Sequence, residues 1–494
     1  MTELQDLATL IRAATPLLVI ETAEENRVIA TFKHLIAQVL RPLYRWSITD
    51  GLKRLDMASD GGDVDVAPDA TATLLGIKHD ADAGIYLLLD FQPYLRYTMT
   101  LRLLREICQR QDCAAHTLVL ISPKLELPED IEPLATRFSL SLPDAQALAQ
   151  LVRDEAFAYS RDNGGKRVEI DADAARAVVR NLRGLGLDDA RRIVRKLIYD
   201  DGALTQADVA ELAKAKFELL NKDGLLHFEY DTARFSDVAG LGHLKTWIEQ
   251  RRAAFLGLKS AAGLDPPKGL LLLGVQGCGK SLAAKAVAGG FGVPLVRLDF
   301  GTLYNKYHGE TERNLRASLA HAEQLAPCVL WVDEIEKGLA GGNNDDGVSR
   351  RVLGYLLTWM AERREAVFLV ATANQVHELP AELLRKGRFD EIFFVDLPGA
   401  AARAEIFAIH LRKRELKSDA FDAAALAAAS DGFSGAEIEQ AVVSALYAAN
   451  ADKCAVDQAH VLRALRDTRP LSVLMAEQVA ALRNWAQGRT VSAD

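Results

Sequence analysis

One stretch of the chain carries the residue types and the spacing of a phosphate-binding loop. Gly274, Gly277, Gly279, Lys280 and Ser281 form the pattern G-x-x-x-x-G-K-S between an apolar run and a helical segment. Glycines let backbone N–H groups turn toward phosphates, and the start of the helix adds its positive end. We expect Lys280 to reach the β- and γ-phosphates of ATP and Ser281 to hold Mg²⁺.

The whole loop and the start of its helix are predicted to contact the nucleotide: Gly274, Val275, Gln276, Gly277, Cys278, Gly279, Lys280, Ser281 and Leu282. Cys278 adds a separate hypothesis, because a lysine and a helix N-terminus both lower the pKa of a thiol. A reactive thiol that bound ATP protects is one interpretation. The other is a small residue that fills space without consequence.

Two carboxylates follow a second apolar run. Cys328–Val332 has the composition of a buried strand, and Asp333 and Glu334 come directly after it. Unpaired buried charge is costly, so a strand that delivers two carboxylates needs a reason. We expect Asp333 to hold Mg²⁺ through water and Glu334 to orient or deprotonate the attacking water.

Three more polar residues follow later strands. Asn374 comes after Val367–Val370, where its amide would reach the γ-phosphate or its water, although asparagine also commonly opens a turn. Arg385 and Arg388 lie further along, three residues apart. Such a pair is normally a solvated basic turn, but an arginine that stabilises phosphoryl transfer can also come from a neighbouring protein.

The elements that would position these residues alternate between strands and helices, which predicts an α/β fold with a parallel sheet covered by helices. The expected strands are Leu270–Leu273, Pro294–Leu298, Cys328–Val332, Val367–Val370 and Ile392–Val395.

These motifs resemble those of AAA-type ATPases of the AAA clade proper. The matching pieces are Asp237–Gly240, the loop at 274–281, Asp333–Glu334, Asn374, Arg385–Asp390 and Phe433–Glu439. The resemblance implies that Val238 and Gly240 contact adenine and that Asn374 is sensor 1. It also implies that Arg385 and Arg388 act in trans within a homo-oligomeric, hexameric ring. Ala436 stands at the sensor 2 place, without an arginine.

A narrower resemblance is to the family named for hypothetical chloroplast reading frame forty-six. It rests on Asp333–Lys337, Leu356–Met360, Asp390–Phe394, Arg469–Ser472 and Trp485. That resemblance implies nothing about the molecule on which the ATPase acts.

The resemblance also implies a translocation loop facing a central pore. Lys306, Tyr307 and His308 match it, with Tyr307 as the gripping residue. As an alternative, Lys306 would contact phosphates, and an aromatic side chain can stack on bases. The second loop near the pore, at 341–347, is acidic and would repel a phosphate backbone. A polypeptide client is therefore favoured over nucleic acid.

The first half repeats the strand pattern of the second half but lacks its phosphate-binding and catalytic residues. Apolar runs recur at an offset of about 250 residues, at Leu17–Ile20, Tyr44–Gly51, Ile85–Asp90, Thr117–Ile121 and Phe138–Pro143. Three acids, Glu21, Glu24 and Glu25, stand where the phosphate loop would be, and Phe91 replaces the catalytic glutamate. We expect a degenerate AAA-like domain that binds no nucleotide; the alternative is an unrelated α/β domain whose strands align by chance.

The predicted organisation has five parts: a degenerate AAA-like domain at 1–150, its helical lid at 151–220, a linker at 221–235, the large ATPase domain at 236–400, and a helical lid with C-terminal helices at 401–494. No apolar run reaches the ~18 residues that span a bilayer. The net charge is −9, from 59 basic and 68 acidic residues. We expect no membrane partner and a cytoplasmic location, or the plastid stroma if the gene is in a chloroplast.

Three functions stay open at this point. The first is an ATP-hydrolysing ring that remodels or threads a macromolecular client, most simply a polypeptide. The second is a switch or scaffold, whose ATP state controls binding of a partner through the inactive half. The third, which the acidic loop disfavours, is a single-stranded nucleic-acid translocase. A P-loop kinase or GTPase would leave Arg385, Arg388 and the lid unexplained.

Overall fold

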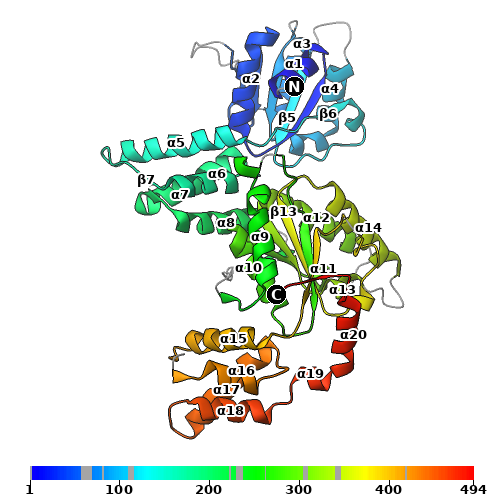
Figure 1. The fold of residues 1–494 in the computed structure, drawn as a ribbon. Helices are drawn as coiled ribbons and strands as arrows, with labels where there is room; N and C mark the ends of the chain where they lie inside the picture. Colours follow the sequence, from blue (N-terminus) through cyan, green and yellow to red (C-terminus); the bar gives the residue numbers. More distant parts are fainter. Residues whose placement is uncertain are drawn as a thin grey trace. The chain divides into compact units, whose positions relative to one another are not determined.

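The chain divides into two compact units, Met1–Asp144 with Gly186–Ala190, and Ala145–Leu185 with Arg191–Asp494. A computed structural model describes residues 3–56, 69–80, 83–109, 116–221, 224–229, 237–261, 263–303, 310–339, 346–385, 387–417 and 420–494. Figure 1 shows the helices and strands of both units. Among the described residues, no helix is long and apolar enough to cross a membrane.

The first unit is built on a six-stranded sheet in the order β3-β2-β4-β5-β1-β6, in which only β2 and β3 pair antiparallel. Its strands are β1 Leu17–Glu21, β2 Leu43–Ser47, β3 Gly51–Arg54, β4 Ile85–Leu89, β5 Thr117–Ser122 and β6 Ala135–Arg137. Its helices are α1 Glu3–Arg12, α2 Glu25–Val39, α3 Ala70–His79 and α4 Thr98–Gln109. Every residue of β4 and β5 is buried, as expected for parallel strands covered on both faces.

Four helices follow in the chain: α5 Ala145–Asp162, α6 Ala172–Asn181, α7 Leu187–Asp201 and α8 Gln206–Leu220. A two-residue ladder joins β7 Glu169–Ile170 to β8 Ala203–Leu204. The amphipathic pattern of α7 and α8 places one apolar face inward, where Leu197 and Leu212 are fully or nearly fully buried.

The ATPase sheet of the second unit has seven strands in the order β15-β14-β10-β13-β12-β11-β9. Its strands are β9 Leu226–Glu229, β10 Gly269–Gly274, β11 Leu295–Leu298, β12 Cys328–Val332, β13 Val367–Ala373, β14 Glu391–Val395 and β15 Val491–Ser492. Its helices are α9 Gly242–Phe255, α10 Lys280–Phe291, α11 Phe300–Leu303, α12 Glu310–Leu325, α13 Ile335–Leu339 and α14 Asp346–Glu362. All pairs are parallel except β9 with β11, so the predicted parallel sheet is confirmed.

A lid of four helices follows the sheet: α15 Ala400–Lys413, α16 Ala423–Ala429, α17 Gly435–Ala451 and α18 Gln458–Asp467. The lid has an apolar core of its own, which includes Phe407 and Ile438. Ser434 begins α17 with a capping box, because its hydroxyl and the carboxylate of Glu437 satisfy each other's backbone N–H groups. The chain then forms α19 Leu471–Leu474 and α20 Ala476–Ala486 and returns to the sheet as β15.

The two sheets share one strand order. Strands β2-β4-β5-β1-β6 of the first unit follow the chain order of β11-β12-β13-β10-β14 in the second. The likeness reaches side chains, since Ser122 donates to Asp90 at 2.9 Å and Thr372 donates to Asp333 at 2.5 Å at matching strand ends. This shared topology supports the reading of the first half as a copy of the second.

Three expectations need correction. The last strand of the first unit, β6, is Ala135–Arg137, just before the predicted Phe138–Pro143, and Phe138 follows it with its side chain packed on the apolar core. The hairpin of β2 and β3 replaces one predicted strand at Tyr44–Gly51. The predicted linker at 221–235 contains β9, which extends the ATPase sheet at one edge.

Candidate nucleotide site

The phosphate loop joins β10 to α10 with the backbone that its glycines permit. Gly277 and Gly279 have φ of +78° and +91°, in the left-handed region that strains residues with a side chain. Gly274 is required for a different reason, since a Cβ there would lie 2.0 Å from the carbonyl oxygen of Val395. These constraints explain why the sequence has glycine at all three positions.

Lys280 begins α10 and is only 7% exposed. Its Nζ donates to the carbonyl oxygens of Gly274 and Val275, both at 2.8 Å. Burial lowers the pKa of Lys280 to about 8, although nearby carboxylates oppose that effect. The amine is therefore held beside the loop by weak partners that a phosphate would outcompete.

Ser281 and Asp333 meet at the base of the loop. The hydroxyl of Ser281 lies 3.4 Å from Oδ1 of Asp333, and Thr372 of β13 donates to the same Oδ1. Thr372 also accepts the backbone N–H of Glu334 at 3.0 Å. Thr372 was not predicted from the sequence. Its only signal there is its position two residues before Asn374.

Glu334 and Asn374 form a direct pair. The side-chain amide of Asn374 donates to Glu334 at 2.8 Å, and Lys337 pairs with the other carboxylate oxygen at 2.5 Å. Glu334 has a φ of +48°, a strained backbone that turns its carboxylate to the end of the sheet. The structure thus brings together the two residues that the sequence assigned to the attacking water.

Glu336 fixes the backbone of Asn374, a role that was not predicted from the sequence. It is 1% exposed, and one of its carboxylate oxygens accepts the backbone N–H of Asn374 at 2.8 Å. Burial raises the pKa of Glu336 above its ordinary value. Its other oxygen has no hydrogen-bond partner among the described residues.

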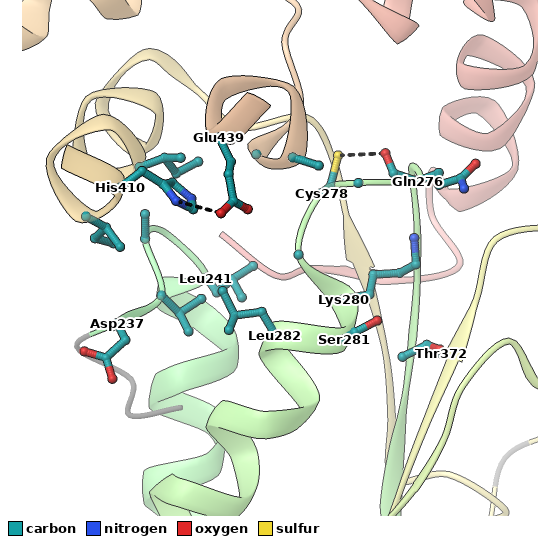
Figure 2. Close-up of a pocket in the computed structure, with 18 of the residues that line it drawn as sticks. Asp237, Leu241, Gln276, Cys278, Lys280, Ser281, Leu282, Thr372, His410 and Glu439 are labelled. Atoms are coloured by element: carbon teal, nitrogen blue, oxygen red, sulfur yellow. Dashed lines mark hydrogen bonds and ion pairs between the residues drawn. The ribbon is translucent and has the colours of Figure 1, made fainter. Parts of the chain in front are cut away.

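One cavity of about 1010 Å³ between the sheet and the lid is lined by Lys280, Ser281, Asp333, Glu334, Thr372 and Asn374. Asp237, Val238, Ala239 and Leu241 form one wall of the cavity, and Leu282 of α10 also lines it. Figure 2 shows this wall, with Lys280 and Ser281 following the loop and Thr372 on the neighbouring strand. Gly240, predicted to contact adenine, lies within the wall segment, and its N–H donates to Glu405 of α15 at 3.3 Å.

The lid supplies polar groups that sequence reasoning did not single out. His410 of α15 lies 3.5 Å from Glu439 of α17, and Arg414 lies 3.0 Å from the same carboxylate. Both His410 and Glu439 line the cavity, and they face each other in Figure 2. Burial raises the pKa of Glu439, but Arg414 and His410 outweigh it and leave the pKa below its ordinary value. Burial lowers the pKa of His410.

The lid touches the phosphate loop directly. The backbone N–H of Ala436 donates to the carbonyl oxygen of Gly277 at 3.1 Å. A Cβ on Gly277 would lie 3.0 Å from the hydroxyl of Ser434, so glycine lets the two segments approach. A movement of the loop at Gly277 would therefore shift the first turn of α17.

The expected low pKa of Cys278 is wrong. Burial raises the pKa of Cys278 to about 12, and the charge of Lys280 offsets only part of this shift. The sulfur lies 4.0 Å from the carbonyl oxygen of Gln276, which gives a thiolate no stabilisation. Desolvation, which the sequence does not display, outweighs the nearby cation.

Among the other predicted residues that the structure describes, Gly274, Val275, Arg385 and Arg388 do not line this cavity. Arg385 is exposed, and Arg388 is half-buried and donates to the carbonyl oxygen of Leu357 on α14. Lys306, Tyr307 and His308 lie outside the described residues.

Three family models match the chain. The ATPase family associated with various cellular activities (AAA) matches residues 270–397, which hold the loop and the paired carboxylates. Two more, described as the N-terminal and second domains of SpoVK-like AAA ATPases, match residues 3–140 and 146–223. The fold and the site therefore define an AAA ATPase, which binds nucleotide and hydrolyses ATP.

Relatives that align along nearly the whole chain place it more narrowly. The "Uncharacterized AAA domain-containing protein ycf46" of Pyropia yezoensis is 33% identical over 98% of this chain and 97% of its own length. Its namesake in Guillardia theta is 34% identical over 98% of this chain and 95% of its own length. The chain belongs to this ycf46 family of AAA-domain proteins, which confirms the narrower resemblance. A proteasome-activating nucleotidase of Aeropyrum pernix is 38% identical over 43% of this chain and 54% of its own length.

Proposed function

We propose that this ATPase works as a ring of six copies that uses ATP to thread or remodel a polypeptide client. The observation that carries the ring is the placement of Arg385 and Arg388. Both lie outside the cavity that holds Lys280, the P-loop and Asp333. A site that leaves its arginines to a neighbouring copy is complete only in an assembly.

Within one site, the oxygen donors fit a hydrated Mg²⁺. The hydroxyl of Ser281 and the carboxylate of Asp333 lie 3.4 Å apart at the base of the loop, and magnesium prefers such ligands. Held by these two residues, Mg²⁺ would supply positive charge that offsets the charge of the phosphates. Val238 and Gly240 would hold the adenine end, and residues 274–282 the phosphates.

Glu334 is the proposed base. Its carboxylate and the amide of Asn374 are already paired at 2.8 Å, and Glu336 fixes the backbone of Asn374. A water held between the carboxylate and the amide would be oriented toward the γ-phosphate. Losing this group should lower turnover on the order of 10²-fold or more without removing ATP.

The polypeptide client rests on two supports. The loop at Lys306–His308 has the translocation pattern, and the acidic segment at 341–347 would repel a phosphate backbone. The Aeropyrum pernix relative is named for activating a proteasome, which concerns a protein substrate. A single-stranded nucleic acid is the disfavoured alternative. The proposed location is the cytoplasm, or the plastid stroma for a chloroplast-encoded protein.

The test measures ATP turnover of the full chain with an unfolded polypeptide, with single-stranded DNA, and with neither. We expect stimulation by the polypeptide only, lost in Tyr307→Ala and kept in the matched exchange Tyr447→Ala, which alters an exposed lid residue. Density for an extended chain in the pore of an ATP-bound Glu334→Gln particle would support threading. Turnover that no polymer changes would refute it.

A second candidate function is a switch that binds its partner through the inactive half. One observation favours it: in the first unit, Glu24 accepts the backbone N–H of Asp188 at 3.1 Å, so an internal carboxylate stands at the loop that would otherwise take phosphate. Slow turnover that is insensitive to polymers, with partner binding that depends on ATP, would select this function.

A further inference from the structure

The last residues of the chain return from the lid to the ATPase sheet. Val491 and Ser492 pair in parallel with Phe393 and Phe394 of β14, so the tail forms an edge strand. Before it, Arg483 of α20 holds Asp396 through two contacts of 2.9 Å, at the point where the sheet leads into the lid. The tail is thus anchored on the sheet that carries the nucleotide site.

Ala493 fixes the tail by burial. It is 1% exposed and belongs to the apolar cluster of Val238, Leu241 and Leu244. Its N–H donates to the carbonyl oxygen of Phe394 at 3.0 Å, and its carbonyl oxygen accepts the N–H of Leu244 at 3.2 Å. One residue therefore joins β14 to the start of α9.

Asp494 then reaches the wall of the cavity. Its Oδ1 accepts the backbone N–H of Leu241, the residue that precedes α9. A Cβ on Gly240 would lie 2.6 Å from the same oxygen, so this contact requires the glycine, whose φ is +62°. The carboxylate also faces the N-terminus of α9, where negative charge is favourable.

Three side chains form hydrogen bonds with the backbone of the wall segment Val238–Leu241. Lys245 of α9 donates to the carbonyl oxygen of Val238 at 2.6 Å, Glu405 of the lid accepts the N–H of Gly240, and Asp494 accepts that of Leu241. Val238 and Leu241 line the cavity. The position of this wall relative to the phosphate loop therefore depends on the tail.

We infer that Val491–Asp494 is a positioning element of the nucleotide site, acting through Leu241 on the wall that meets the adenosine end. This inference rests on the proposed assignment of the cavity to ATP. Among the described residues, no hydrogen bond joins Val491–Asp494 to the phosphate loop, so the tail sets how tightly nucleotide binds and leaves the chemistry at Glu334 unchanged.

The test uses the full chain and measures ADP affinity by calorimetry together with kcat and KM for ATP. Losing one charge-assisted hydrogen bond to a backbone N–H predicts for Asp494→Ala a rise of about fivefold in both Kd and KM. We expect kcat at saturating ATP to stay within about twofold of the starting protein. Asp494→Asn keeps an oxygen acceptor and should recover most of the affinity.

Two more variants serve as a control and as a larger perturbation of the same strand. Ser492→Ala changes an exposed side chain of the same strand while its backbone contacts stay, so its KM should not move. Deleting residues 491–494 should raise KM further than Asp494→Ala. An unchanged KM in both Asp494→Ala and the deletion would overturn the inference, as would a loss confined to kcat.

Lys280→Ala separates this inference from the site assignment. If Lys280→Ala abolishes ADP binding while Asp494→Ala leaves it unchanged, the nucleotide site stands and only the role of the tail fails. If Lys280→Ala leaves ADP binding unchanged, the assignment of the cavity itself fails, and the inference fails with it.

Discussion

The buried amine of Lys216 on α8 should make the free energy of unfolding depend on pH. It is 2% exposed, and its Nζ donates to the carbonyl oxygens of Arg183 and Ala326. These carbonyls follow the C-terminal ends of α6 and α12, where a cation is favourable. The segments approach so closely that a Cβ on Gly184 would lie 2.3 Å from the carbonyl oxygen of Gln324. Lys216 thus joins the helices at 145–220 to the start of the β12 strand.

Burial has a calculable cost at this residue. It lowers the pKa of Lys216 from the ordinary 10.5 to about 8. The folded state therefore holds this proton less tightly than the unfolded chain, so stability rises with pH between about 8 and 10.5 and the cost is fully present below that window. A shift of this size corresponds to about 3 kcal/mol.

Lys216→Met removes the charge and keeps the length of the side chain. It also leaves two carbonyl oxygens without a donor, each costing about 1–3 kcal/mol. The two effects oppose each other, so the free energy of unfolding at pH 7 should change by less than about 2 kcal/mol. The diagnostic quantity is its pH dependence: wild type should gain about 1.3 kcal/mol relative to Lys216→Met between pH 7 and 9.

Urea unfolding of both proteins at pH 7 and pH 9, followed by tryptophan fluorescence, measures this double difference. Lys214→Met is the matched control, because Lys214 is exposed on the same helix and its exchange should leave the pH dependence unchanged. The reasoning is refuted if the difference between wild type and Lys216→Met is the same at both pH values, since the amine would then titrate normally.

Three further predictions concern function. Alkylation followed by mass spectrometry should modify exposed Cys454, which has His460 at 3.6 Å, faster than Cys278, with or without Mg-ATP; faster reaction at Cys278 would contradict the effect of burial. Calorimetry should find one ATP per chain, because Glu24 is held inside the first unit; a stoichiometry of two would disprove this. Mixing Arg388→Ala with Lys280→Ala subunits should restore part of the turnover that each lacks alone, measured as ATPase activity against mixing ratio; no restoration at any ratio would count against sites shared between copies.

Much of the fold and part of the site follow from the sequence because their requirements are local. The loop needs glycine at 277 and 279 for positive φ, and this pattern is visible in eight consecutive residues. The five central strands are visible because parallel strands covered on both faces are continuous apolar runs. Glu334 and Asn374 could be paired in advance because the ends of neighbouring parallel strands meet at one edge.

What the sequence did not display depends on contacts between distant residues. The pKa of Cys278 is set by the packing that buries it, and its immediate neighbours suggested the opposite direction. The holder of Leu241 is Asp494, 253 positions away, and no local pattern links them. Strands β9 and β15 are short edge strands. Their pairing with β11 and β14 defines them, and their own sequences show no periodicity that would predict them.

The two units share a strand order, so our prediction that the first unit binds no nucleotide rests on particular residues. Both units have a hydroxyl bonded to the aspartate at the end of the third parallel strand, Ser122 with Asp90 and Thr372 with Asp333, so this pair does not distinguish the two units. The difference lies beside it. Phe91, which follows Asp90, is fully buried, with its ring centroid 5.0 Å from that of Trp46.

A glutamate at position 91 would place a carboxylate in that apolar core, at a cost that exceeds any benefit to chemistry. At the loop, a nucleotide would have to displace the carboxylate of Glu24 from the N–H of Asp188 and would meet Glu21 and Glu25 as well. We therefore expect that no single substitution would give the first unit the activity of the second, because one barrier lies in the core and the other at the loop.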